Sequence, residues 1–507
     1  MTTPKPKYPE KGTDTVRLLR ERRICVVIPT YNNVGTIVDV VGRALLQCKD
    51  VIVVNDGSTD GTTEVLRKIT GITLIENQRN KGKGAALKHA LQQASEMGFV
   101  YAITLDADGQ HYPEDIPLLL EGTIRHPGAI IIGKRKLSGV TRSSGSKFAN
   151  AFSNFWFFVH TLHYLPDTQS GFRLYPLRKL HVLPLLTSRY EAELELLVSC
   201  SWNGVSIVSV PIEVFYPPKE ERVSHFKPAS DFARIFVLNT ILCILALVWG
   251  YPSRILRALH TFARTAFALL IYLLGLCIIG PFSLSHALFT KWFGQCNSKL
   301  YTLLHLYGKL VTRLLQFISC KVTVHNMYAE SFSKPAIIIC NHQSHLDLMI
   351  LLGLTKNIIF LTNDRVYNNP FYGHILHNAQ YYPISMGYEN LKPKIKKMTD
   401  RGFCIAIFPE GTRSKDCRIG KFYNGAFQLA NDLGLDILPL VLYGAGRALP
   451  KNSVFIHKSP IELHIEKRIT PEESEKLGST VREQSKWFRN FYINRLTDIS
   501  NKIAQHV

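Results

Sequence analysis

Short apolar runs rich in β-branched residues recur along this chain, and each is followed by polar turn residues and a helical stretch. In the first part the runs are ICVVIPT (24–30), VIVVND (51–56), FVYAITLDAD (99–108) and AIIIGKR (129–135). Buried strands that alternate with helices are typical of a mostly parallel sheet. Ligands of such sheets bind at the carboxyl ends of the strands. We therefore expect functional residues directly after these runs.

The same pattern returns in the last part of the chain. There the runs are AIIICNH (336–342), NIIFLTN (357–363), CIAIFPEGT (404–412) and DILPLVLYG (436–444). The two parts carry different motifs in a different order, so they are not copies of one domain. A chain of 507 residues is also too long for one ordinary core. We predict an α/β protein with two distinct α/β domains.

Two apolar runs lie between these parts, at 235–251 and 265–289. Each approaches the length that crosses a bilayer. The residues between them include Arg254, Arg257 and Arg264, which a full first crossing would place outside, against the positive-inside tendency. We therefore predict a hairpin that dips into the inner leaflet, or two helices that lie partly in the interface. The alternative is a pair of core helices in a soluble protein.

These patterns divide the chain into five segments. They are a basic mobile tail (1–23), a first α/β domain (24–232), a membrane-associated helical hairpin (233–290), a connecting helix (291–321) and a second α/β domain (322–507).

Charge and cysteine usage narrow the class of protein. The net charge of +21 suits an anionic membrane surface or phosphorylated substrates. Nucleic acid is disfavoured, because the chain has no basic helix with interleaved aromatic residues and no zinc-finger spacing. The ten cysteines form no CxxC motif, which favours reduced thiols in a cytosolic compartment. The first residues contain no apolar run of the kind found in secretory signals.

The stretch LDADGQH (105–111) contains the first candidate site. Asp106 and Asp108 are two residues apart at a predicted strand end, where their carboxylates can share a divalent ion. Mg²⁺ or Mn²⁺ prefers such oxygen ligands and usually keeps phosphate oxygens in its shell. An ion held in this way neutralises a diphosphate leaving group. Two exposed acids on a polar loop would look the same, so the pair alone is a weak signal.

The order of motifs around this pair is more specific. IPTYNN, VVNDGSTDGT, NKGKGAAL, LDADGQH, QSGFRLYP and VPIEVFYPP follow one another between 28 and 218. This series resembles inverting family-2 glycosyltransferases of the GT-A nucleotide-sugar fold, most closely the dolichyl- and polyprenyl-phosphate sugar transferases. The resemblance covers about 24–232.

The resemblance implies a nucleotide-sugar site with a residue-by-residue set of roles. Asp56 contacts the nucleotide base, Asp106 and Asp108 hold ribose, metal and diphosphate, Gln110 lies near the sugar, and Arg173 lies near phosphate. The remaining positions that it assigns to this site are Pro29, Tyr31, Asn33 and Lys83. Asn55 and Asn33 depart from the acids common in the family, which leaves the nucleotide and the sugar open.

The catalytic base of the first site stays open as well. Glu193, or its neighbour Glu191, can serve if the acceptor is a hydroxyl, although both could instead lie on one exposed helix face. An acceptor that is a lipid phosphate is already ionised and needs no base. The basic stretch RVSHFKPASDFARI (222–235) fits a lipid-phosphate contact and equally a charge belt at a membrane surface.

The stretch NHQSHLD (341–347) contains the second candidate site. His342 can act as a general base near neutral pH, and Asp347 can fix its tautomer and orientation. The pair would take a proton from an acceptor hydroxyl as it attacks a thioester. A zinc site built from His342 and His345 is less favoured, because neither an HExxH motif nor a third ligand lies nearby.

FPEGTRS (408–414) supplies the partner motif. Gly411, Thr412 and Arg413 can present backbone N–H groups and a guanidinium to an anionic headgroup. Glu410 either positions the acceptor or holds the loop.

Together these motifs resemble the PlsC-type 1-acylglycerol-3-phosphate acyltransferases over about 320–460. NHQSHLD matches the family's NHxxxxD block, FPEGTRS its glycerolipid-binding block and ILPLVLYG its last block. TNDRVYNNPFYGHIL (362–376) matches the second block in part. Asn363 and Arg365 depart from that block, which leaves the headgroup open. The resemblance implies acyl-CoA or acyl-carrier protein as donor and a membrane lipid as acceptor.

We therefore predict a bifunctional enzyme of glycolipid synthesis at the cytoplasmic face of the inner membrane. It transfers a sugar from a nucleotide-sugar to a lipid-type acceptor, and an acyl chain to a hydroxyl of the same or a related lipid. Fusion raises the effective concentration for successive steps. The alternatives are two independent activities that share one anchor, or one half that only binds lipid. By analogy alone, such fusions resemble bacterial glycolipid enzymes.

Overall fold

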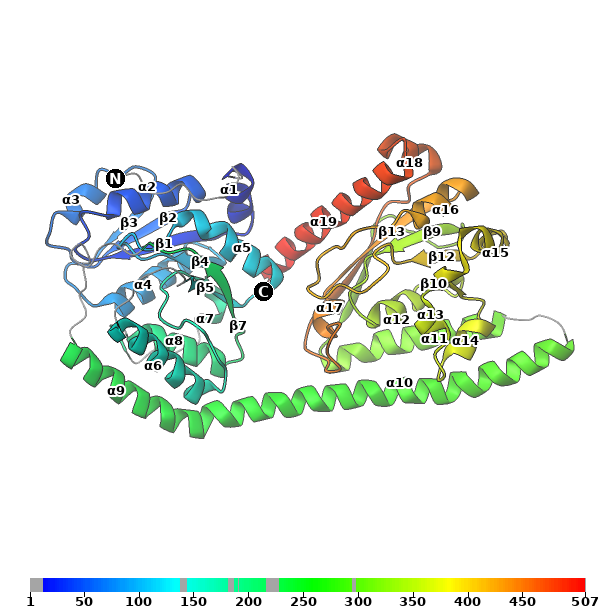
Figure 1. Ribbon diagram of the computed structural model, residues 1–507, viewed down its shortest axis with the longest axis horizontal. Helices are drawn as coiled ribbons and strands as arrows, with labels where there is room; N and C mark the ends of the chain where they lie inside the picture. The colour runs from blue at the N-terminus through cyan, green and yellow to red at the C-terminus, as the bar shows by residue number, and fades with distance from the viewer. Residues whose placement is uncertain are drawn as a thin grey trace. The chain divides into compact units, whose positions relative to one another are not determined.

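The computed structural model describes residues 12–136, 144–180, 187–189, 191–215, 228–293 and 298–506. It divides into two compact units, drawn with their element labels in Figure 1. The first runs from the N-terminus to Arg257 and includes the last residues from Asn501, and the second runs from Ala258 to Ser500.

The first unit is built on a seven-stranded sheet with the order β3-β2-β1-β4-β6-β5-β7. Strands β3, β2, β1 and β4 are parallel, and β6 is antiparallel to its neighbours β4 and β5. The four predicted strands are confirmed as β1, β2, β4 and β5. The strands are β1 (Ile24–Thr30), β2 (Val51–Asn55), β3 (Ile72–Glu76), β4 (Tyr101–Thr104), β5 (Ile130–Arg135), β6 (Arg173–Pro176) and β7 (Ile207–Ile212).

Helices cover both faces of this sheet, because the side chains of each strand alternate between two apolar cores. In β1, Cys25 and Val27 enter the core beneath α4 and α8, whereas Val26 and Ile28 enter the core beneath α2 and α5. The helices are α1 (Gly12–Glu21), α2 (Ile37–Gln47), α3 (Thr62–Leu66), α4 (Lys83–Glu96), α5 (Ile116–Arg125), α6 (Ser144–Thr161), α7 (Leu177–Leu180) and α8 (Glu191–Trp202), with the short 3₁₀ turn η1 (Pro113–Asp115).

The segment predicted as a mobile tail differs in the structure. Residues 12–21 form α1, and Leu19 on this helix is fully buried against the first unit. The apolar residues of α1 gather on one face despite its many charges, so the helix packs instead of staying in solvent. Residues 1–11 lie outside the described part of the chain.

The predicted hairpin is wrong, because the two apolar runs form one helical stretch. Helix α9 (Pro228–Leu245), the π-helical turn η3 (Ala246–Gly250) and α10 (Tyr251–Phe293) follow one another directly. The N–H of Tyr251 bonds to the carbonyl of Ala246, which is the wider spacing of a π turn. Through this turn the helix continues from the first apolar run toward the second.

Two of the three arginines that motivated the hairpin cap helices of the first unit. Arg254 donates to the carbonyl of Thr161 at 2.5 Å, and Arg257 donates to the carbonyl of Trp202 at 2.6 Å. These carbonyls belong to the last residues of α6 and α8, where a positive charge is favourable. Their positions therefore follow from helix capping, and they carry no information on a membrane crossing.

Helix α9 also differs from a free membrane span. Its side chains Leu238 and Leu242 are buried in the core of the first unit, whereas Phe236 and Ile244 on its other face are exposed. One face therefore packs on protein and the other does not. The alternative of two helices that lie partly in a membrane interface stays a prediction.

The second unit is built on another seven-stranded sheet, with the order β11-β10-β12-β9-β13-β14-β8. All of its pairs are parallel except β13 with β14. The four predicted strands are confirmed as β9, β10, β12 and β13. The strands are β8 (Val322–Asn326), β9 (Ala336–Cys340), β10 (Ile358–Thr362), β11 (Tyr382–Pro383), β12 (Cys404–Ile407), β13 (Asp436–Tyr443) and β14 (Ile461–Ile465).

Helices again connect the strands. Helix α12 follows β9 directly, and α19 packs over the sheet, where the Tyr492 hydroxyl donates to the carbonyl of Ile339. The helices are α11 (Ser298–Leu315), α12 (Leu346–Leu352), α13 (Asp364–Tyr367), α14 (Gly373–Asn378), α15 (Tyr388–Asp400), α16 (Gly425–Leu433), α17 (Ala445–Ala448), α18 (Pro471–Leu477) and α19 (Val481–His506), with 3₁₀ turns η4 (Gln316–Ile318) and η5 (Ile384–Met386).

Candidate functional site

The first candidate site lies at the carboxyl ends of β1, β2 and β4, as the sequence pattern predicts. Asp56 directly follows β2 and is almost fully buried. Its carboxylate accepts hydrogen bonds from the side chain of Asn77 at 2.8 Å and from the backbone N–H groups of Lys81 and Gly82 at 3.1 and 2.8 Å. In this conformation Asp56 therefore fixes the loop that leads into α4.

Lys83, the first residue of α4, joins two carboxylates. Its Nζ lies 2.8 Å from Oδ1 of Asp106 and 2.8 Å from Oε1 of Glu193. These ion pairs raise the pKa of Lys83, although burial opposes them. Burial also raises the pKa of Asp106, but the positive charge of Lys83, followed by His111 and Arg173, outweighs it and brings the pKa to about 2. Asp106 therefore stays ionised at neutral pH.

Arg173 extends this chain of ion pairs into the core. Its side chain is fully buried, and its Nη2 lies 3.2 Å from Oε2 of Glu193. Its nitrogens also donate to the carbonyls of Ser170 and Thr168 and to the hydroxyl of Tyr175. A guanidinium enclosed in this way does not reach a phosphate, so the structure does not support the contact that the resemblance implied. Arg173 instead positions Glu193.

The exposed-face alternative for the glutamates of α8 is wrong. Glu191, Glu193 and Glu195 are all buried, and helix α8 is covered on every side. Glu195 accepts from the backbone and the hydroxyl of Thr187, whereas Oε2 of Glu191 has no hydrogen-bond partner among the described residues. Of these three glutamates, Glu193 is the one that forms an ion pair with Lys83, which also forms an ion pair with Asp106.

Two close approaches of glycine backbone make this cluster possible. A Cβ on Gly171 would lie 2.2 Å from Oδ2 of Asp106, and a Cβ on Gly84 would lie 2.4 Å from the Cβ of Ala192. The first glycine lets β6 approach the acid, and the second lets α4 and α8 bring Lys83 and Glu193 together. The glycines of the motifs QSGFRLYP and NKGKGAAL therefore help to position Asp106, Lys83 and Glu193, because they leave room for close packing.

Asp108 and Gln110 lie on the turn after β4. Oδ1 of Asp108 accepts from the backbone N–H of Gln110 at 3.0 Å. Burial, followed by the negative charge of Asp106, raises the pKa of Asp108. Two neighbouring carboxylates that repel each other in this way suit a shared divalent cation, so the residues present fit the Mg²⁺ or Mn²⁺ that the sequence predicts.

His111 is a site residue to which the sequence analysis gave no role. It is buried, its Nδ1 lies 3.9 Å from Oδ2 of Asp106, and neither ring nitrogen has a hydrogen-bond partner among the described residues. Burial lowers its pKa, against the pull of Asp106 and Asp108. His111 is the last residue of the motif LDADGQH. Its position in that motif, close to Asp106 and Asp108, was the signal from which the sequence analysis could have predicted it as a site residue.

The remaining predicted residues shape the turn after β1. Pro29 is part of β1 and pairs with Val54 of β2. Tyr31 is the first residue after β1. The side chain of Asn33 donates to the Thr30 hydroxyl and to the carbonyl of Tyr31. Asn33 therefore holds this turn in shape with its own side chain.

The second candidate site is the predicted His–Asp pair at the carboxyl end of β9. Nδ1 of His342 lies 2.8 Å from Oδ2 of Asp347, which is fully buried. The same oxygen accepts from the backbone N–H groups of Gln343 at 2.7 Å and Ser344 at 2.8 Å. An acceptor carboxylate on Nδ1 leaves Nε2 of His342 as the basic nitrogen.

The ring of His342 is also held by an aromatic neighbour. It stacks on Phe408 with ring centroids 4.1 Å apart and an angle of 21° between the planes. No protein group among the described residues bonds to its Nε2, and 15% of the side chain is exposed. The base is therefore oriented on one nitrogen and accessible on the other.

Glu410 holds the loop, which decides between its two predicted roles. Its carboxylate accepts from the backbone N–H of His342 at 2.9 Å and from that of Gly420 at 2.7 Å. It is almost fully buried, and burial raises its pKa. Glu410 therefore joins the FPEGTRS motif to the NHQSHLD motif.

Thr412 and Arg413 lie on the turn that begins at Gly411, whose φ of +65° favours glycine. Lys451, which the sequence analysis missed, donates to the hydroxyl of Thr412 at 2.9 Å and to the carbonyl of Arg413 at 2.7 Å. Lys451 lies far along the chain in no recognised motif, so only the fold brings it here. Arg413 lies close enough to contribute to a lowered pKa of His345, after burial.

Comparison with known proteins gives one family for each unit. Residues 25–175 match the model of glycosyl transferase family 2, and residues 321–443 match an acyltransferase model. A UDP-N-acetylglucosamine–dolichyl-phosphate N-acetylglucosaminyltransferase from Methanococcus voltae is 30% identical over 39% of this chain and 88% of its own length. The polyprenol monophosphomannose synthase of Mycolicibacterium smegmatis is 30% identical over 51% of this chain and 98% of its own length.

The chain belongs to glycosyltransferase family 2. Its second unit carries a PlsC-type acyltransferase domain. A chloroplastic 1-acyl-sn-glycerol-3-phosphate acyltransferase of Arabidopsis thaliana is 29% identical over 36% of this chain, which spans about half (50%) of that protein. Both predicted families are thus confirmed.

Solved structures also align with parts of this family-2 glycosyltransferase. The PlsC acyltransferase of Thermotoga maritima aligns over 48% of this chain and 98% of its own, with 20% identity and a TM-score of 0.39. The glucosyl-3-phosphoglycerate synthase of Mycobacterium tuberculosis aligns over 47% of this chain and 85% of its own, with 20% identity and a TM-score of 0.36.

Proposed function

We propose that this protein is a bifunctional, membrane-associated enzyme of glycolipid synthesis. The first unit transfers a sugar from a nucleotide-sugar to a lipid-type acceptor, and the second transfers an acyl chain to a hydroxyl of the same or a related lipid. The observation that carries the proposal is that one chain holds two complete sets of reactive side chains. They are Asp106, Asp108 and Lys83 in one unit, and His342 with Asp347 in the other.

In the first unit Asp106 and Asp108 would hold Mg²⁺ or Mn²⁺, which would neutralise the charge of the departing nucleoside diphosphate. Lys83 brings a further positive charge to the same place. Gln110 follows on the same turn, where the sugar would lie, and Asp56 shapes the loop beside which the nucleotide would bind.

The pairing of Glu193 favours an acceptor that is already ionised. One of its oxygens lies 2.8 Å from Lys83 and the other 3.2 Å from Arg173. Because both of its oxygens are engaged by cations, neither is free to take the proton of an acceptor hydroxyl. A lipid phosphate needs no base. The names of the archaeal and mycobacterial relatives, which refer to dolichyl phosphate and polyprenol, support a polyprenyl-phosphate acceptor.

In the second unit Nε2 of His342 takes the proton of the acceptor hydroxyl as its oxygen attacks the thioester carbonyl of acyl-CoA or acyl-carrier protein. The C–O bond of the ester forms, the C–S bond breaks, and the proton on His342 passes to the leaving thiolate. Asp347 holds the ring throughout. The Gly411–Arg413 turn offers N–H groups and a guanidinium to an anionic headgroup.

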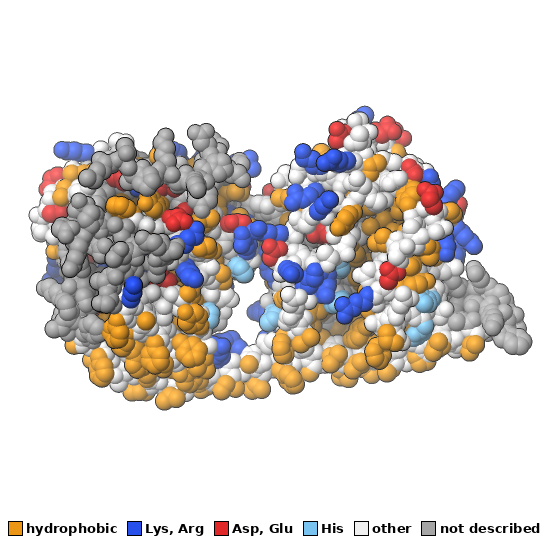
Figure 2. All heavy atoms as spheres, viewed as in Figure 1, with side chains coloured by type: hydrophobic (Ala, Val, Ile, Leu, Met, Phe, Trp, Pro, Cys, Tyr) orange, Lys and Arg blue, Asp and Glu red, His pale blue; other side chains and the backbone are white. Residues whose placement is uncertain are grey.

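The long apolar helix provides the membrane contact in this proposal. Residues Ala233–Ser285 are long and apolar enough to cross a membrane by length and composition, and 22% of their most apolar stretch is buried. Core helices of soluble proteins can pass the same test, but they are mostly buried. Figure 2 shows hydrophobic side chains gathered along α10. Because both donors are cytosolic molecules, we place the enzyme on the cytoplasmic face of the cell membrane.

Lipid mass spectrometry of three strains tests the proposal. The strains carry the wild type, Asp108→Ala or His342→Ala. We expect one lipid to be lost from both mutants, and one mutant to accumulate it without the sugar or without the acyl chain. Matched controls are Asp39→Ala and His260→Ala, because both side chains are exposed and lie outside the sites.

Loss of a different lipid in each mutant would contradict a shared substrate. It would favour two independent activities, such as a polyprenyl-phosphate glycosyltransferase and a lysophosphatidate acyltransferase on one anchor. The acylglycerol-phosphate specificity in the name of the plant relative makes this the second candidate.

A further inference from the structure

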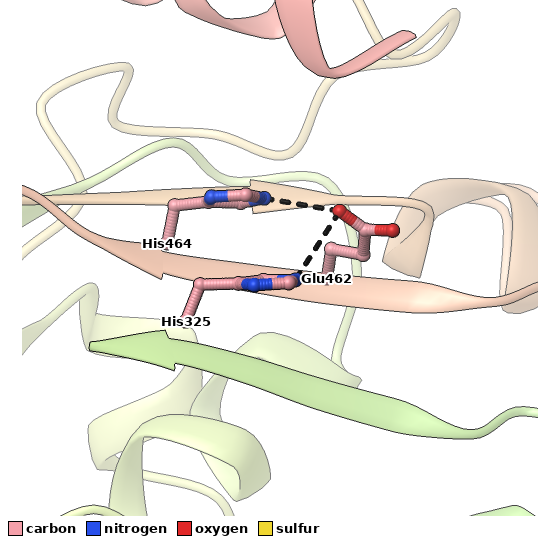
Figure 3. Close-up of side chains that lie close together, drawn as sticks. All are labelled: His325, Glu462 and His464. Carbon is pink, nitrogen blue, oxygen red and sulfur yellow. Dashed lines mark hydrogen bonds and ion pairs between the residues drawn. The ribbon is translucent and has the colours of Figure 1, made fainter. Parts of the chain in front are cut away.

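A cluster of metal-ligating side chains lies in the second unit, outside the His342 site. It consists of His325 on β8 and of Glu462 and His464 on β14 (Figure 3). Nε2 of His464 lies 3.0 Å and Nε2 of His325 lies 3.5 Å from the same oxygen, Oε2 of Glu462. The two imidazole rings stack, with centroids 4.3 Å apart and 13° between their planes.

The sheet itself brings these three side chains together. Glu462 and His464 are two residues apart on β14, so they project from the same face of the strand. Their neighbours Ile461, Leu463 and Ile465 are buried on the other face. In the parallel pairing of β14 with β8, His464 lies directly beside His325. Because β8 is the last strand of this sheet, the cluster lies at its edge.

The distances suit one tetrahedral divalent ion. With metal–ligand bonds of about 2.0–2.1 Å, tetrahedral geometry places neighbouring ligand atoms about 3.3 Å apart. The two separations from Oε2 of Glu462, 3.0 and 3.5 Å, lie on either side of this value. A small rotation of the two rings away from their parallel stack would direct both lone pairs to one point.

The cluster also holds a nitrogen without a hydrogen bond. Nε2 of His325 is shielded from solvent and has no hydrogen-bond partner among the described residues. One carboxylate oxygen thus faces two imidazole nitrogens and forms a hydrogen bond with only one of them. A bound ion would satisfy both nitrogens and the carboxylate together.

We propose that His325, Glu462 and His464 form a binding site for a divalent ion of the Zn²⁺ class. Two imidazoles and one carboxylate are ligands that Zn²⁺ prefers, and water completes the fourth position. The side chain of His325 is 39% exposed, which gives the ion a path of entry.

The ion at this site is structural. The strand order places β14 two strands and β8 three strands from β9, the strand that leads to His342. At about 4.8 Å between strands, this is a separation of roughly 10–14 Å, too far for a metal ligand of the reacting atoms. Its effect is to tie the edge strand β8 to β14.

Metal analysis of the tag-free, full-length protein tests the site. The chain is stripped with a chelator, loaded with Zn²⁺ alone and passed through gel filtration, and bound zinc is then counted. We expect the wild type to keep one more equivalent of zinc per chain than His325→Asn or His464→Asn. His260→Asn is the matched control, because His260 is an exposed histidine of the same unit. Any zinc at the Asp106/Asp108 pair is equal in all four proteins and cancels.

Two further readouts separate a site from a local fold defect. Co²⁺ in place of Zn²⁺ is expected to give the strong visible absorption of a tetrahedral nitrogen-ligated ion in the wild type, and to lose it in His325→Asn. Zn²⁺ is expected to raise the unfolding temperature of the wild type and of His260→Asn by several degrees more than that of His325→Asn, because binding stabilises the folded state. Equal zinc content and equal Co²⁺ spectra in all proteins would overturn the proposal.

Discussion

The two candidate sites are held together in different ways. In the first unit, Asp106, Lys83, Glu193 and Arg173 form a chain of ion pairs between side chains that come from four separate segments of the chain. In the second unit, Asp347 is held by backbone N–H groups only a few residues away and orients a single histidine. The first arrangement depends on a balance of charges between distant residues. The second is formed by hydrogen bonds among residues 342–347, which follow one another in the chain.

This difference predicts how each site responds to its substrates. Lys83 is bonded to two carboxylates, and the diphosphate of a donor would offer it another anionic partner. The first site is therefore expected to rearrange when it binds metal and donor. The base in the second site needs no rearrangement, because the tautomer of His342 is already fixed by Asp347.

The largest expected effect is that of His342→Ala on acyl transfer. Removal of the base should lower the rate by about 10²–10⁴-fold, measured with acyl-CoA and the purified full chain. Glycosyl transfer should be unchanged. His260→Ala is the matched control, since this exposed histidine of the same unit lies outside the pair. Equal losses in both variants would break the assignment of the base.

Gly171→Ala should have the next largest effect, on glycosyl transfer. The added Cβ would lie 2.2 Å from Oδ2 of Asp106 and must displace that carboxylate. A shift of about 1 Å in such a group can cost about 100-fold, so we expect a loss of about 10–100-fold, read from sugar transfer at saturating Mn²⁺.

Gly35→Ala is the control for this variant, because a Cβ on Gly35 meets no atom within 4 Å. Acyl transfer should be unaffected by either change. Full glycosyl transfer in Gly171→Ala would mean that the position of Asp106 is unimportant.

Lys83→Met should change the acid stability of the first unit. The folded-state pKa of Asp106 is about 2, below its ordinary value of 3.8. Its ionisation therefore contributes stability that is present above about pH 4 and is lost as the pH falls toward 2. Without Lys83 the pKa of Asp106 rises, so acid unfolding should begin at a higher pH, as followed by circular dichroism.

Lys88→Met is the comparison for this measurement, because Lys88 is exposed and lies just over one turn along the same helix. If both variants unfold at the same pH, the ion pairs of the first site do not set its stability.

Lys451→Ala should have the smallest effect. This side chain donates to the hydroxyl of Thr412 and to the carbonyl of Arg413. It therefore stabilises the Gly411–Arg413 turn that we propose binds the headgroup. Loss of about 1 kcal/mol of hydrogen bonding corresponds to about a fivefold rise in KM for the acyl acceptor. The value of kcat should stay the same, whereas a fall in kcat with constant KM would contradict a role in binding. Lys458→Ala, at another exposed lysine of this unit, is the control.

The sequence predicted both sheets and the placement of functional residues at their strand ends. The strand Ala336–Cys340 is apolar throughout, Ile24–Thr30 is apolar up to its last residue, and both are followed by polar turns, so the local pattern was sufficient. The His342–Asp347 pair was predictable for the same reason, because both residues lie within one motif.

Long-range packing explains what the sequence did not predict. Arg173 was expected at a phosphate, but the fold encloses it beside Glu193. Arg254 and Arg257 served as an argument for a membrane hairpin, but they cap helices from other parts of the chain. Lys451 lies in none of the motifs that the sequence analysis identified, so its contact with Thr412 and Arg413 was not predicted. In each case the partner is distant in the sequence, and no local pattern identifies it.

The central claim is that the two units modify one lipid. The most direct test is intact-lipid mass spectrometry of products made by the purified full-length chain in membrane vesicles that contain the acceptor. Both donors are supplied, the nucleotide-sugar with a heavy sugar label and the acyl-CoA with a different heavy label. We predict one lipid that carries both mass shifts, with the doubly labelled product absent from Asp108→Ala and from His342→Ala. Two singly labelled lipids and no doubly labelled one would contradict the account.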